Sequence, residues 1–406
     1  MKYVVVVGDG MADYPLPELG NRTPLQVARK PNMDAIAAKG RNGLLRTVPD
    51  GLSSGSDVAI LSVLGFNPKK FYTGRGAFEA AARGIKLKDN DVAFRCNLIT
   101  EKDGVLADYS AGHITSTDST PLIEAVKKAC EKPGEIEFYS GLDYRHFLIL
   151  RNAPLALQIE CTPPHDAIGA EISAVLPKAK SPEAEKTAAL LKDAILKSRE
   201  ILEAHQVNAA RQKSGKNPGN MIWPWGGGKK PNLPSFKEKY GVKAAVISAV
   251  DLVKGIGIYT RMKVIDVPGA TGRDDTNYEG KADAALKALK NHDLVFVHVE
   301  APDEAGHAKD YKLKVKTIED LDRRLLGRIL EGLEEPCAIA VLPDHPTPIR
   351  IGTHTKDPVP FAIQSPSLEA DGVQKFDEFS AKNGGFGLVE QEGVVSLLLS
   401  STSNRK

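Results

Sequence analysis

Three apolar runs of the sequence each end in acidic or imidazole side chains of the kind that bind metal ions. The runs have the length and composition of buried strands, and the carboxyl ends of parallel strands meet at one edge of an α/β sheet. Carboxylate oxygens and imidazole nitrogens suit Mn²⁺, Zn²⁺, Co²⁺ or Mg²⁺, and this set is large enough for two ions. One such pair alone would most often be a capping or loop feature, but three strand ends together favour metal binding. The candidate ligands are Asp9, Asp303, His307, Asp344, His345 and His354.

A candidate nucleophile lies in the Gly/Ser-rich loop of residues 49–56, directly before a predicted helix at Asp57–Leu64. A hydroxyl at a helix N-terminus lies among free N–H groups that can hold a phosphate, and an adjacent metal ion lowers its pKa. A serine in this position is usually only a helix cap. Beside a two-metal site the nucleophile becomes the favoured interpretation, and Ser54 and Ser56 are both candidates.

The order of the predicted elements indicates one α/β domain that is interrupted by an insertion. Strand and helix signals alternate in residues 1–85 and 236–406, whereas residues 86–235 contain more varied strands separated by proline and glycine loops. Trp223–Gly228 has the composition of a flexible hinge. The predicted strands are Tyr3–Val7, Leu44–Val48, Ala244–Ile247, Lys263–Val267, Leu294–Val299, Ala338–Leu342 and Val359–Ile363. The predicted helices include Pro31–Lys39, Lys316–Leu333 and a long helix that Ser181 caps.

Bulk composition excludes several classes of partner. The chain has 406 residues, 54 basic and 52 acidic side chains, and a net charge of +2, so nothing indicates binding to nucleic acid or to a membrane surface. The four cysteines are scattered, as in proteins with reduced thiols. No apolar run approaches the roughly 20 residues that span a bilayer, and the N-terminal run is too short for a secretory signal. We therefore expect a cytoplasmic protein.

Several motifs together resemble the cofactor-independent phosphoglycerate mutases of the archaeal type, in the alkaline phosphatase superfamily. The resemblance covers essentially the whole chain and implies an α/β, alkaline-phosphatase-like three-layer sandwich with an inserted α+β cap domain that closes on the substrate. The motifs are Gly8-Asp9-Gly10-Met11, Ser54-Gly55-Ser56-Asp57-Val58, residues 73–79, Phe94-Arg95-Cys96-Asn97, residues 298–307, Pro343-Asp344-His345 and Thr353-His354-Thr355.

The resemblance also implies a role for each candidate ligand. One metal ion would be held by Asp303, His307 and His354, and the other by Asp9, Asp344, His345 and the nucleophile. The family nucleophile lies in an Asn-Ser-Glu-Val context, which aligns with Gly55-Ser56-Asp57-Val58 and selects Ser56. Ser54 remains the alternative, because the loop is rich in serine and glycine replaces the family asparagine.

The implied function is the interconversion of 3- and 2-phosphoglycerate through a phosphoserine, with two divalent ions, manganese among them, and without 2,3-bisphosphoglycerate. The partner would be a small phosphorylated acid, and no oligomeric state is implied. One alternative is a related metal-dependent phosphatase or phosphotransferase, such as a proposed homoserine kinase, although the sequence has no recognisable nucleotide pocket. Another is an inactive metal-binding protein, which the complete ligand set disfavours. The candidate substrate-binding residues are Arg83, His113, Arg145 and Lys254.

Overall fold

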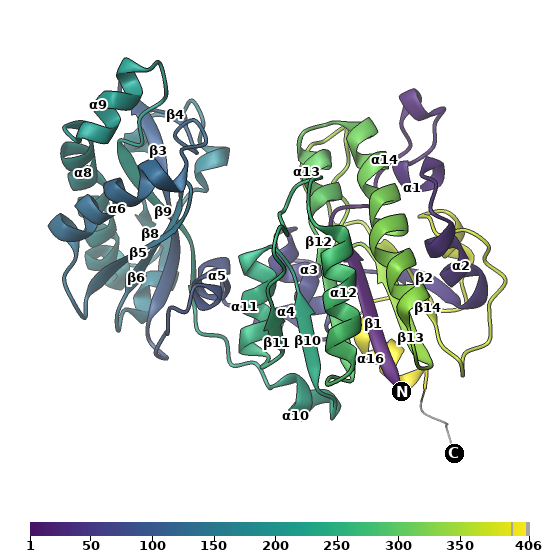
Figure 1. The fold of residues 1–406 in the computed structure, drawn as a ribbon. Coiled ribbons are helices and arrows are strands. Elements are labelled where there is room, and N and C mark those ends of the chain that lie inside the picture. The colour runs from purple at the N-terminus through teal and green to yellow at the C-terminus, as the bar shows by residue number, and fades with distance from the viewer. Residues whose placement is uncertain (391–392, 403–406) are drawn as a thin grey trace. The chain divides into compact units, whose positions relative to one another are not determined.

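The computed structural model describes residues 1–390 and 393–402, and the chain divides into two compact units (Figure 1). The first unit is Met1–Tyr72 with Asn232–Lys406, and the second is Thr73–Pro231. A segment is thus inserted, but the predicted boundaries after residues 85 and 235 both lie too late in the chain. The first is wrong because helix α5 (Arg75–Ala82) packs on strands of the second unit.

The first unit is built on an eight-stranded sheet with the order β11-β10-β12-β1-β13-β14-β2-β15. All of its strands run parallel except β14, which is antiparallel to both of its neighbours. The strands are β1 (Lys2–Gly8), β2 (Arg41–Leu45), β10 (Ala244–Ile247), β11 (Lys263–Ile265), β12 (Leu294–Val299), β13 (Cys337–Leu342), β14 (Val359–Gln364) and β15 (Gly387–Val389).

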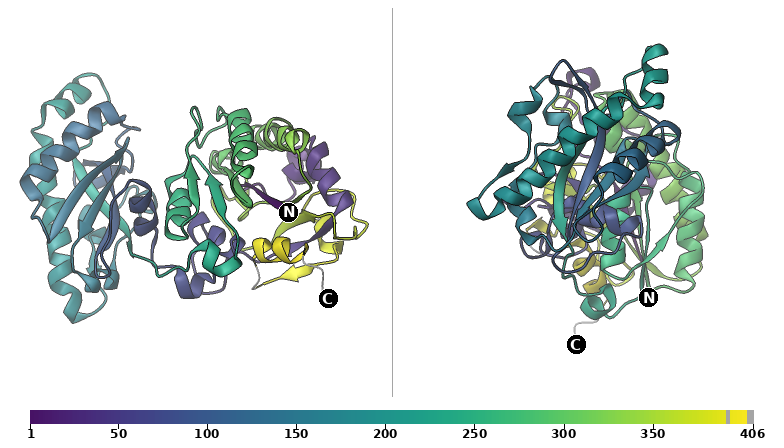
Figure 2. Two further views of the ribbon diagram at one scale, coloured as in Figure 1. Left: turned by 60° about the horizontal axis from the view of Figure 1, so that its bottom comes forward. Right: turned by 90° about the vertical axis from the view of Figure 1, so that its left-hand side faces the viewer.

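Helices cover both faces of this sheet, which confirms the predicted α/β three-layer sandwich (Figures 1 and 2). One face packs against α2 (Pro31–Lys39), α12 (Tyr278–Leu289) and the continuous helix of α14 (Tyr311–Asp320), a π-helical segment (Leu321–Gly327) and α15 (Arg328–Gly332). The other face carries α3 (Ser56–Val63), α11 (Asp251–Tyr259) and α16 (Val394–Ser400). The remaining helices are α1 (Pro24–Val27), α4 (Pro68–Phe71), α10 (Phe236–Tyr240) and α13 (Ala301–His307), with short 3₁₀ turns at Pro17–Leu19 and Ser380–Asn383.

Burial on both faces explains why the central strands are continuous apolar runs. In β1, Val4 and Val6 join the core under α2 and α12, and all four valines from Val4 to Val7 are completely buried. The prediction for β2 was shifted, since the strand is Arg41–Leu45 and not Leu44–Val48. The prediction relied on a run of apolar residues and therefore excluded the polar start of this strand. Asn42 is nevertheless buried, because it is hydrogen-bonded to Asp371.

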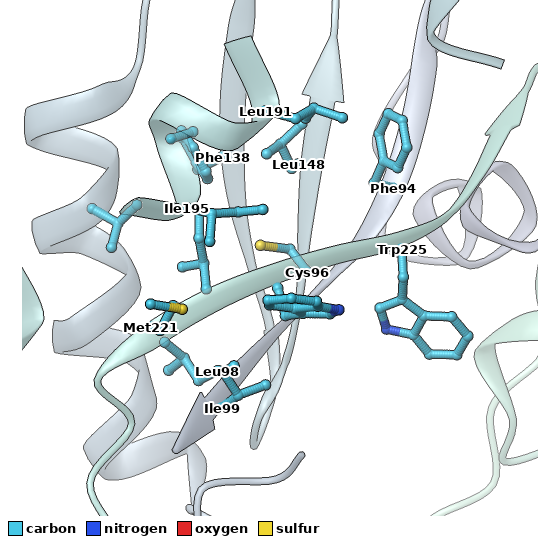
Figure 3. Close-up of a cluster of buried hydrophobic side chains, with 14 of the residues drawn as sticks. Phe94, Cys96, Leu98, Ile99, Phe138, Leu148, Leu191, Ile195, Met221 and Trp225 are labelled. Carbon is cyan, nitrogen blue, oxygen red and sulfur yellow. The ribbon is translucent and has the colours of Figure 1, made fainter. Parts of the chain in front are cut away.

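The second unit has an antiparallel sheet in which β3 is the central strand (Figure 1). Its core packs β3, β5, β6 and β9 against α6 and α8, as the buried side chains of Phe94, Cys96, Phe138, Leu191 and Ile195 illustrate (Figure 3). The strands are β3 (Val92–Lys102), β4 (Val105–Asp108), β5 (Ile136–Leu142), β6 (Arg145–Leu150), β7 (Ile159–Glu160), β8 (Lys178–Ala179) and β9 (Met221–Lys229). The helices after α5 are α6 (Ser116–Cys130), α7 (Ile172–Val175), α8 (Glu185–Glu203) and α9 (Gln206–Lys213), with 3₁₀ turns at Pro154–Gln158, Pro164–Asp166 and Pro182–Ala184.

Two predictions for this unit were wrong. Ser181 makes no side-chain cap, because a 3₁₀ turn precedes α8. Residues 223–228 are no hinge but part of β9, paired along β3. Their glycines allow close packing of α5, since a Cβ on Gly228 would lie 2.4 Å from the carbonyl oxygen of Gly74. Nowhere in the described part of the chain does a helix combine the length and the apolar character that a membrane crossing requires.

Glu378 makes the stability of the first unit depend on pH. Its carboxylate accepts hydrogen bonds from the Asp13 backbone N–H at 3.0 Å and from the Thr23 hydroxyl at 2.7 Å. Burial raises the pKa of Glu378 from 4.5 to about 7. Between these values Glu378 keeps its proton in the folded chain and loses it in the unfolded chain, so its contribution to the free energy of unfolding should fall as the pH rises, by roughly 1–3 kcal/mol.

We expect Glu378→Gln to remove this pH-dependent loss. Urea unfolding at pH 5 and pH 8 should show a smaller decrease for the variant than for the wild type. Glu369→Gln, at an exposed position nearby in the chain, is the matched control and should behave as wild type. An equal decrease in the Glu378 variant would contradict the assignment.

Candidate two-metal active site

The predicted ligands converge at the carboxyl ends of three adjacent parallel strands, β12, β1 and β13. Asp9 follows β1, and Asp344 follows β13. Asp303 lies on α13, the short helix after β12. Gly10 turns the chain directly after Asp9 with φ +62°, and a Cβ there would lie 2.6 Å from Asp303 Oδ1. Only glycine therefore fits this position, where the loop approaches the ligand of a neighbouring strand.

Ser56, and not Ser54, is the hydroxyl that lies among these ligands. It is the first residue of α3, and its Oγ is 3.2 Å from Asp9 Oδ2 and 3.1 Å from His345 Nε2. The Ser54 hydroxyl instead donates to the backbone oxygen of His354 at 3.1 Å. The position of Ser56 at the start of a helix beside a carboxylate and an imidazole matches that of an activated nucleophile.

Asp57, the residue after Ser56, secures the start of α3. Its carboxylate accepts a hydrogen bond from the Tyr72 hydroxyl at 2.5 Å and another from the Val58 backbone N–H at 3.1 Å. The side chain is buried. Asp57 thus fixes the backbone that presents Ser56.

The first predicted set, Asp303, His307 and His354, forms a compact cluster. His307 Nε2 lies 3.2 Å from Asp303 Oδ2 and 3.0 Å from His354 Nε2, and His354 Nε2 lies 3.6 Å from Asp303 Oδ1. His345 is close enough to share a cation with Asp303 and His354. Thr347 donates a hydrogen bond to Asp303 and so orients the carboxylate.

The second predicted set, Asp9, Asp344, His345 and Ser56, is also brought together. His345 Nε2 lies 3.4 Å from Asp9 Oδ1 and 3.5 Å from Asp344 Oδ2, and all three side chains are completely buried. Within residues 1–390 and 393–402, Asp9 Oδ1 and Asp344 Oδ2 accept no hydrogen bond. Buried carboxylate oxygens without donors are costly, and a divalent cation would satisfy both. The residues therefore fit divalent metal ions.

The electrostatics of the site also indicate a need for positive charge. Burial, and then the neighbouring carboxylates of Asp344, Glu300 and Asp303, raise the pKa of Asp9 well above its usual range. Burial opposes ionisation of Asp303 too, but hydrogen bonds from His307 and His354 outweigh it and hold its pKa well below the usual range. Crowded acids of this kind ionise together when a cation lies between them.

The sequence prediction missed His298, which is completely buried at the end of β12. Its Nε2 lies 2.9 Å from Asp9 Oδ2, and its Nδ1 lies 3.2 Å from the Ser248 hydroxyl. With Asp9 and Asp344 it forms a group that could hold a metal ion. Burial lowers the pKa of His298 to about 4, so the imidazole is neutral. His298 begins a motif quoted for the family resemblance, but no role was given to it, because a histidine inside an apolar strand is more often a core residue.

Lys314, which the sequence prediction also missed, joins the two loops that carry the central ligands. Its ammonium is completely buried and donates to Asp13 at 2.8 Å, to the backbone oxygen of Ala12 at 3.2 Å and to that of Thr347 at 2.9 Å. The loops after β1 and β13 are thereby fixed to α14. A buried ion pair with all its hydrogen bonds satisfied holds one geometry.

Two of the predicted substrate-binding residues, His113 and Arg145, lie in one aromatic cluster of the second unit. The Arg145 guanidinium is exposed and stacks 4.2 Å from the centroid of the Tyr144 ring. The His113 ring lies 6.2 Å from that of Tyr144, and the Tyr109 ring lies 5.8 Å from it. Ala111, Gly112 and His113 all have positive φ, from +51° to +67°. Left-handed backbone at consecutive residues that include non-glycines is strained, and such strain gathers at functional sites.

Arg95 and Trp225 extend this cluster. The Arg95 guanidinium stacks 4.4 Å from the Trp225 ring, and its Nε lies 3.0 Å from Glu79 Oε2. Burial lowers the pKa of Arg95 to about 10, and the nearby Arg145 contributes to this shift. Arg95 belongs to a motif quoted for the family resemblance, so the signal was present although no role was given to it. Guanidinium groups on aromatic rings suit carboxylate or phosphate ligands.

The other two predicted substrate-binding residues lie outside this cluster. Arg83 is exposed at the C-terminal end of α5. Lys254, on α11 of the first unit, pairs with Asp266 at 2.5 Å. Lys254 also contributes to the lowering of the pKa of the buried Lys281, which donates to the backbone oxygen of His298 at 3.0 Å.

Comparisons with known proteins agree on one family. The family model described as 2,3-bisphosphoglycerate-independent phosphoglycerate mutase matches residues 37–208. A relative of that name from Methanosarcina mazei is 52% identical over 405 residues, which cover 99% of this chain and 100% of the relative. A probable mutase of the same name from Geobacter sulfurreducens is 49% identical and covers 97% of this chain and 98% of its own.

Two solved structures are similar over the full length. The PH0037 protein of Pyrococcus horikoshii is 31% identical, with a TM-score of 0.85 and coverage of 100% of this chain and 99% of that one. A cofactor-independent phosphoglycerate mutase from Thermoplasma acidophilum is also 31% identical, with a TM-score of 0.65 and coverage of 99% and 100%. Because relatives that are 49–52% identical cover this chain almost end to end, the chain belongs to the family of 2,3-bisphosphoglycerate-independent phosphoglycerate mutases.

Proposed function

We propose that this protein interconverts 3-phosphoglycerate and 2-phosphoglycerate through a phosphoserine at Ser56, without 2,3-bisphosphoglycerate. The observation that carries the proposal is the Ser56 hydroxyl, held between Asp9 and His345 at the start of α3, beside a second cluster of metal ligands. Relatives that align over 99% of the chain bear the name of this activity, which supports the substrate.

The reaction consists of two transfers with opposite directions. Ser56 Oγ attacks phosphorus, the new O–P bond forms as the ester P–O bond of the substrate breaks, and glycerate leaves. Asp9 Oδ2 already accepts the Ser56 hydroxyl hydrogen bond and so lies where the proton must go. The glycerate oxygen that leaves takes up this proton. The other hydroxyl of the retained glycerate then gives its proton to Asp9 as it attacks phosphorus, the Ser56 O–P bond breaks, and Ser56 Oγ takes the proton back.

Two divalent ions complete the site in this proposal. Asp303, His307 and His354 would hold one, and Asp9, Asp344 and His345, with Ser56, would hold the other. When bound, such ions stabilise negative charge on the serine and phosphoryl oxygens. Glu300 and Lys281 contribute fixed charge behind Asp9.

The second unit would bind the glycerate end of the substrate. Arg95 and Arg145 each stack on an aromatic ring, which holds the guanidinium plane in place for a carboxylate. His113 adds an imidazole on the strained turn beside them. Retention of glycerate between the two transfers requires such an anchor, and exclusion of water protects the phosphoserine. Closure of the inserted unit stays a prediction from the sequence.

We expect Arg145→Ala to raise the KM for 3-phosphoglycerate roughly 10- to 100-fold, with a smaller change in kcat, because a charge-assisted contact to the carboxylate is lost. Arg83→Ala removes an exposed arginine of the same unit and is the matched comparison. Steady-state rates at varied 3-phosphoglycerate measure both. A larger rise in KM for the Arg83 variant would transfer the role to that residue.

Phosphorus NMR tests the function directly. The metal-loaded protein is incubated with 3-phosphoglycerate, without 2,3-bisphosphoglycerate and without nucleotide. Appearance of the 2-phosphoglycerate signal supports the proposal. Release of free phosphate alone identifies a phosphatase, and no change directs the next assay to ATP with homoserine as acceptor.

A further inference from the structure

A continuous chain of hydrogen bonds crosses the carboxyl ends of β10, β12 and β1, which are neighbours in the sheet. Ser248, just after β10, contacts His298 Nδ1 at 3.2 Å, and His298 Nε2 contacts Asp9 Oδ2 at 2.9 Å. Ser248 is buried, and His298 and Asp9 are completely buried. The chain therefore ends on the carboxylate that faces the candidate nucleophile.

The Asp9 carboxylate selects one tautomer of His298. An ionised carboxylate can only accept hydrogen bonds, so the ring proton of the neutral imidazole lies on Nε2, which donates to Asp9 Oδ2. Nδ1 then accepts the hydroxyl proton of Ser248, whose oxygen accepts the Val250 backbone N–H at 3.0 Å. Lys281 fixes the same residue from the backbone side, since its ammonium donates to the His298 oxygen at 3.0 Å.

As a result, the two carboxylate oxygens of Asp9 differ in their hydrogen bonds. Oδ2 accepts from both His298 and Ser56, whereas Oδ1 accepts no hydrogen bond from the described residues. We propose that His298 is a positioning residue: Ser248 supports its tautomer by donating to Nδ1, and its Nε2–H holds Asp9 so that Oδ1 is presented to a divalent cation. Partners behind a metal ligand of this kind typically change metal affinity 10- to 100-fold when removed. The inference rests on the metal site of the proposed function.

The test measures Mn²⁺ binding to the full-length apoprotein by isothermal titration calorimetry. We expect His298→Leu to weaken one of two ions roughly 10- to 100-fold while both still bind at saturation. His298→Gln keeps a donor at a similar reach and should stay within a few-fold of wild type. Ser248→Ala should weaken the same ion several-fold, and Ser248→Thr, which retains the hydroxyl, should not.

Three outcomes would overturn the proposal. Unchanged Mn²⁺ affinity in His298→Leu would show that the hydrogen bond does not position Asp9. Binding of a single ion by both His298 variants would make His298 a direct ligand. A loss of apoprotein stability in urea and EDTA, without any change in affinity, would indicate a structural role only. If His298→Leu fails to fold, the Ser248 pair gives the same comparison.

The readout separates this inference from the proposed function. If the wild type binds two ions with the expected dependence on His298 but makes no 2-phosphoglycerate, the function is wrong and the inference stands. If the wild type makes 2-phosphoglycerate and His298→Leu binds Mn²⁺ normally, the proposed function stands and the inference about His298 is wrong.

Discussion

Replacement of Ser56 with alanine should abolish phosphoryl transfer, with a loss of at least roughly 10⁴-fold in kcat, because no other hydroxyl contacts both Asp9 and His345 among the described residues. The metal ligands outside Ser56 remain in this variant, so it should still bind divalent ions. Conversion of 3-phosphoglycerate followed by phosphorus NMR gives the rate, and mass spectrometry of the wild type during turnover should locate phosphate on Ser56.

Ser54→Ala is the matched control, two residues earlier in the same loop. Its hydroxyl donates only to the backbone oxygen of His354 in the structure, so we expect a modest loss of rate. Normal turnover by Ser56→Ala, or loss of transfer in Ser54→Ala alone, would refute the choice of nucleophile.

Removal of Asp303 should have an effect of comparable size, through the metal content. Asp303 is the only carboxylate that His307 and His354 both contact at ion-pair distance in the described chain, so Asp303→Ala should lose one ion of two and roughly 10³-fold in rate. His345→Ala removes the imidazole that lies close to both groups and should lower the occupancy of each. Elemental analysis after dialysis gives the number of ions per chain.

Glu304→Gln is the control for this experiment, since Glu304 is the next residue of α13 but is exposed. Two bound ions and near-normal turnover are expected there. Unchanged metal content in both Asp303→Ala and His345→Ala would undo the assignment of two metal sites.

The candidate ligands could be predicted from sequence because their signals are local. The apolar runs that become β1, β12 and β13 are each followed within a few residues by an acidic or imidazole side chain, and the sheet brings these side chains together at one edge. The family resemblance added the choice between Ser54 and Ser56, which composition alone left open. The contacts of Ser56 with Asp9 and His345 agree with that choice.

The residues that sequence reasoning missed depend on strand order and strand faces. His298 looks like a core residue until β10 and β1 become its neighbours and bring Ser248 and Asp9 to its two ring nitrogens. Arg95 becomes significant only when the antiparallel pairing with β9 sets Trp225 opposite it. Such juxtapositions join residues 50 positions apart for Ser248 and His298 and 289 apart for His298 and Asp9, and no local pattern contains them.

The glycines near residue 226 show a different limit of pattern reading. Glycine is frequent both in flexible linkers and where two backbones touch, so composition could not tell a hinge from a strand. The contact of Gly228 with Gly74 decides between them.

A hydrogen bond beside this contact has a consequence for folding order. The chain enters the second unit at Thr73 and leaves it after Pro231, and the Thr73 hydroxyl donates to the Lys229 carbonyl at 2.5 Å. If this segment folds first, it brings together two points 156 residues apart. If the segment stays unfolded, the first unit must close a loop of that length in order to assemble. The entropic cost of closing such a loop is roughly 4 kcal/mol. To the first unit, the folded segment then acts as a short connection, so its early folding would speed the assembly of the sheet that carries the metal ligands.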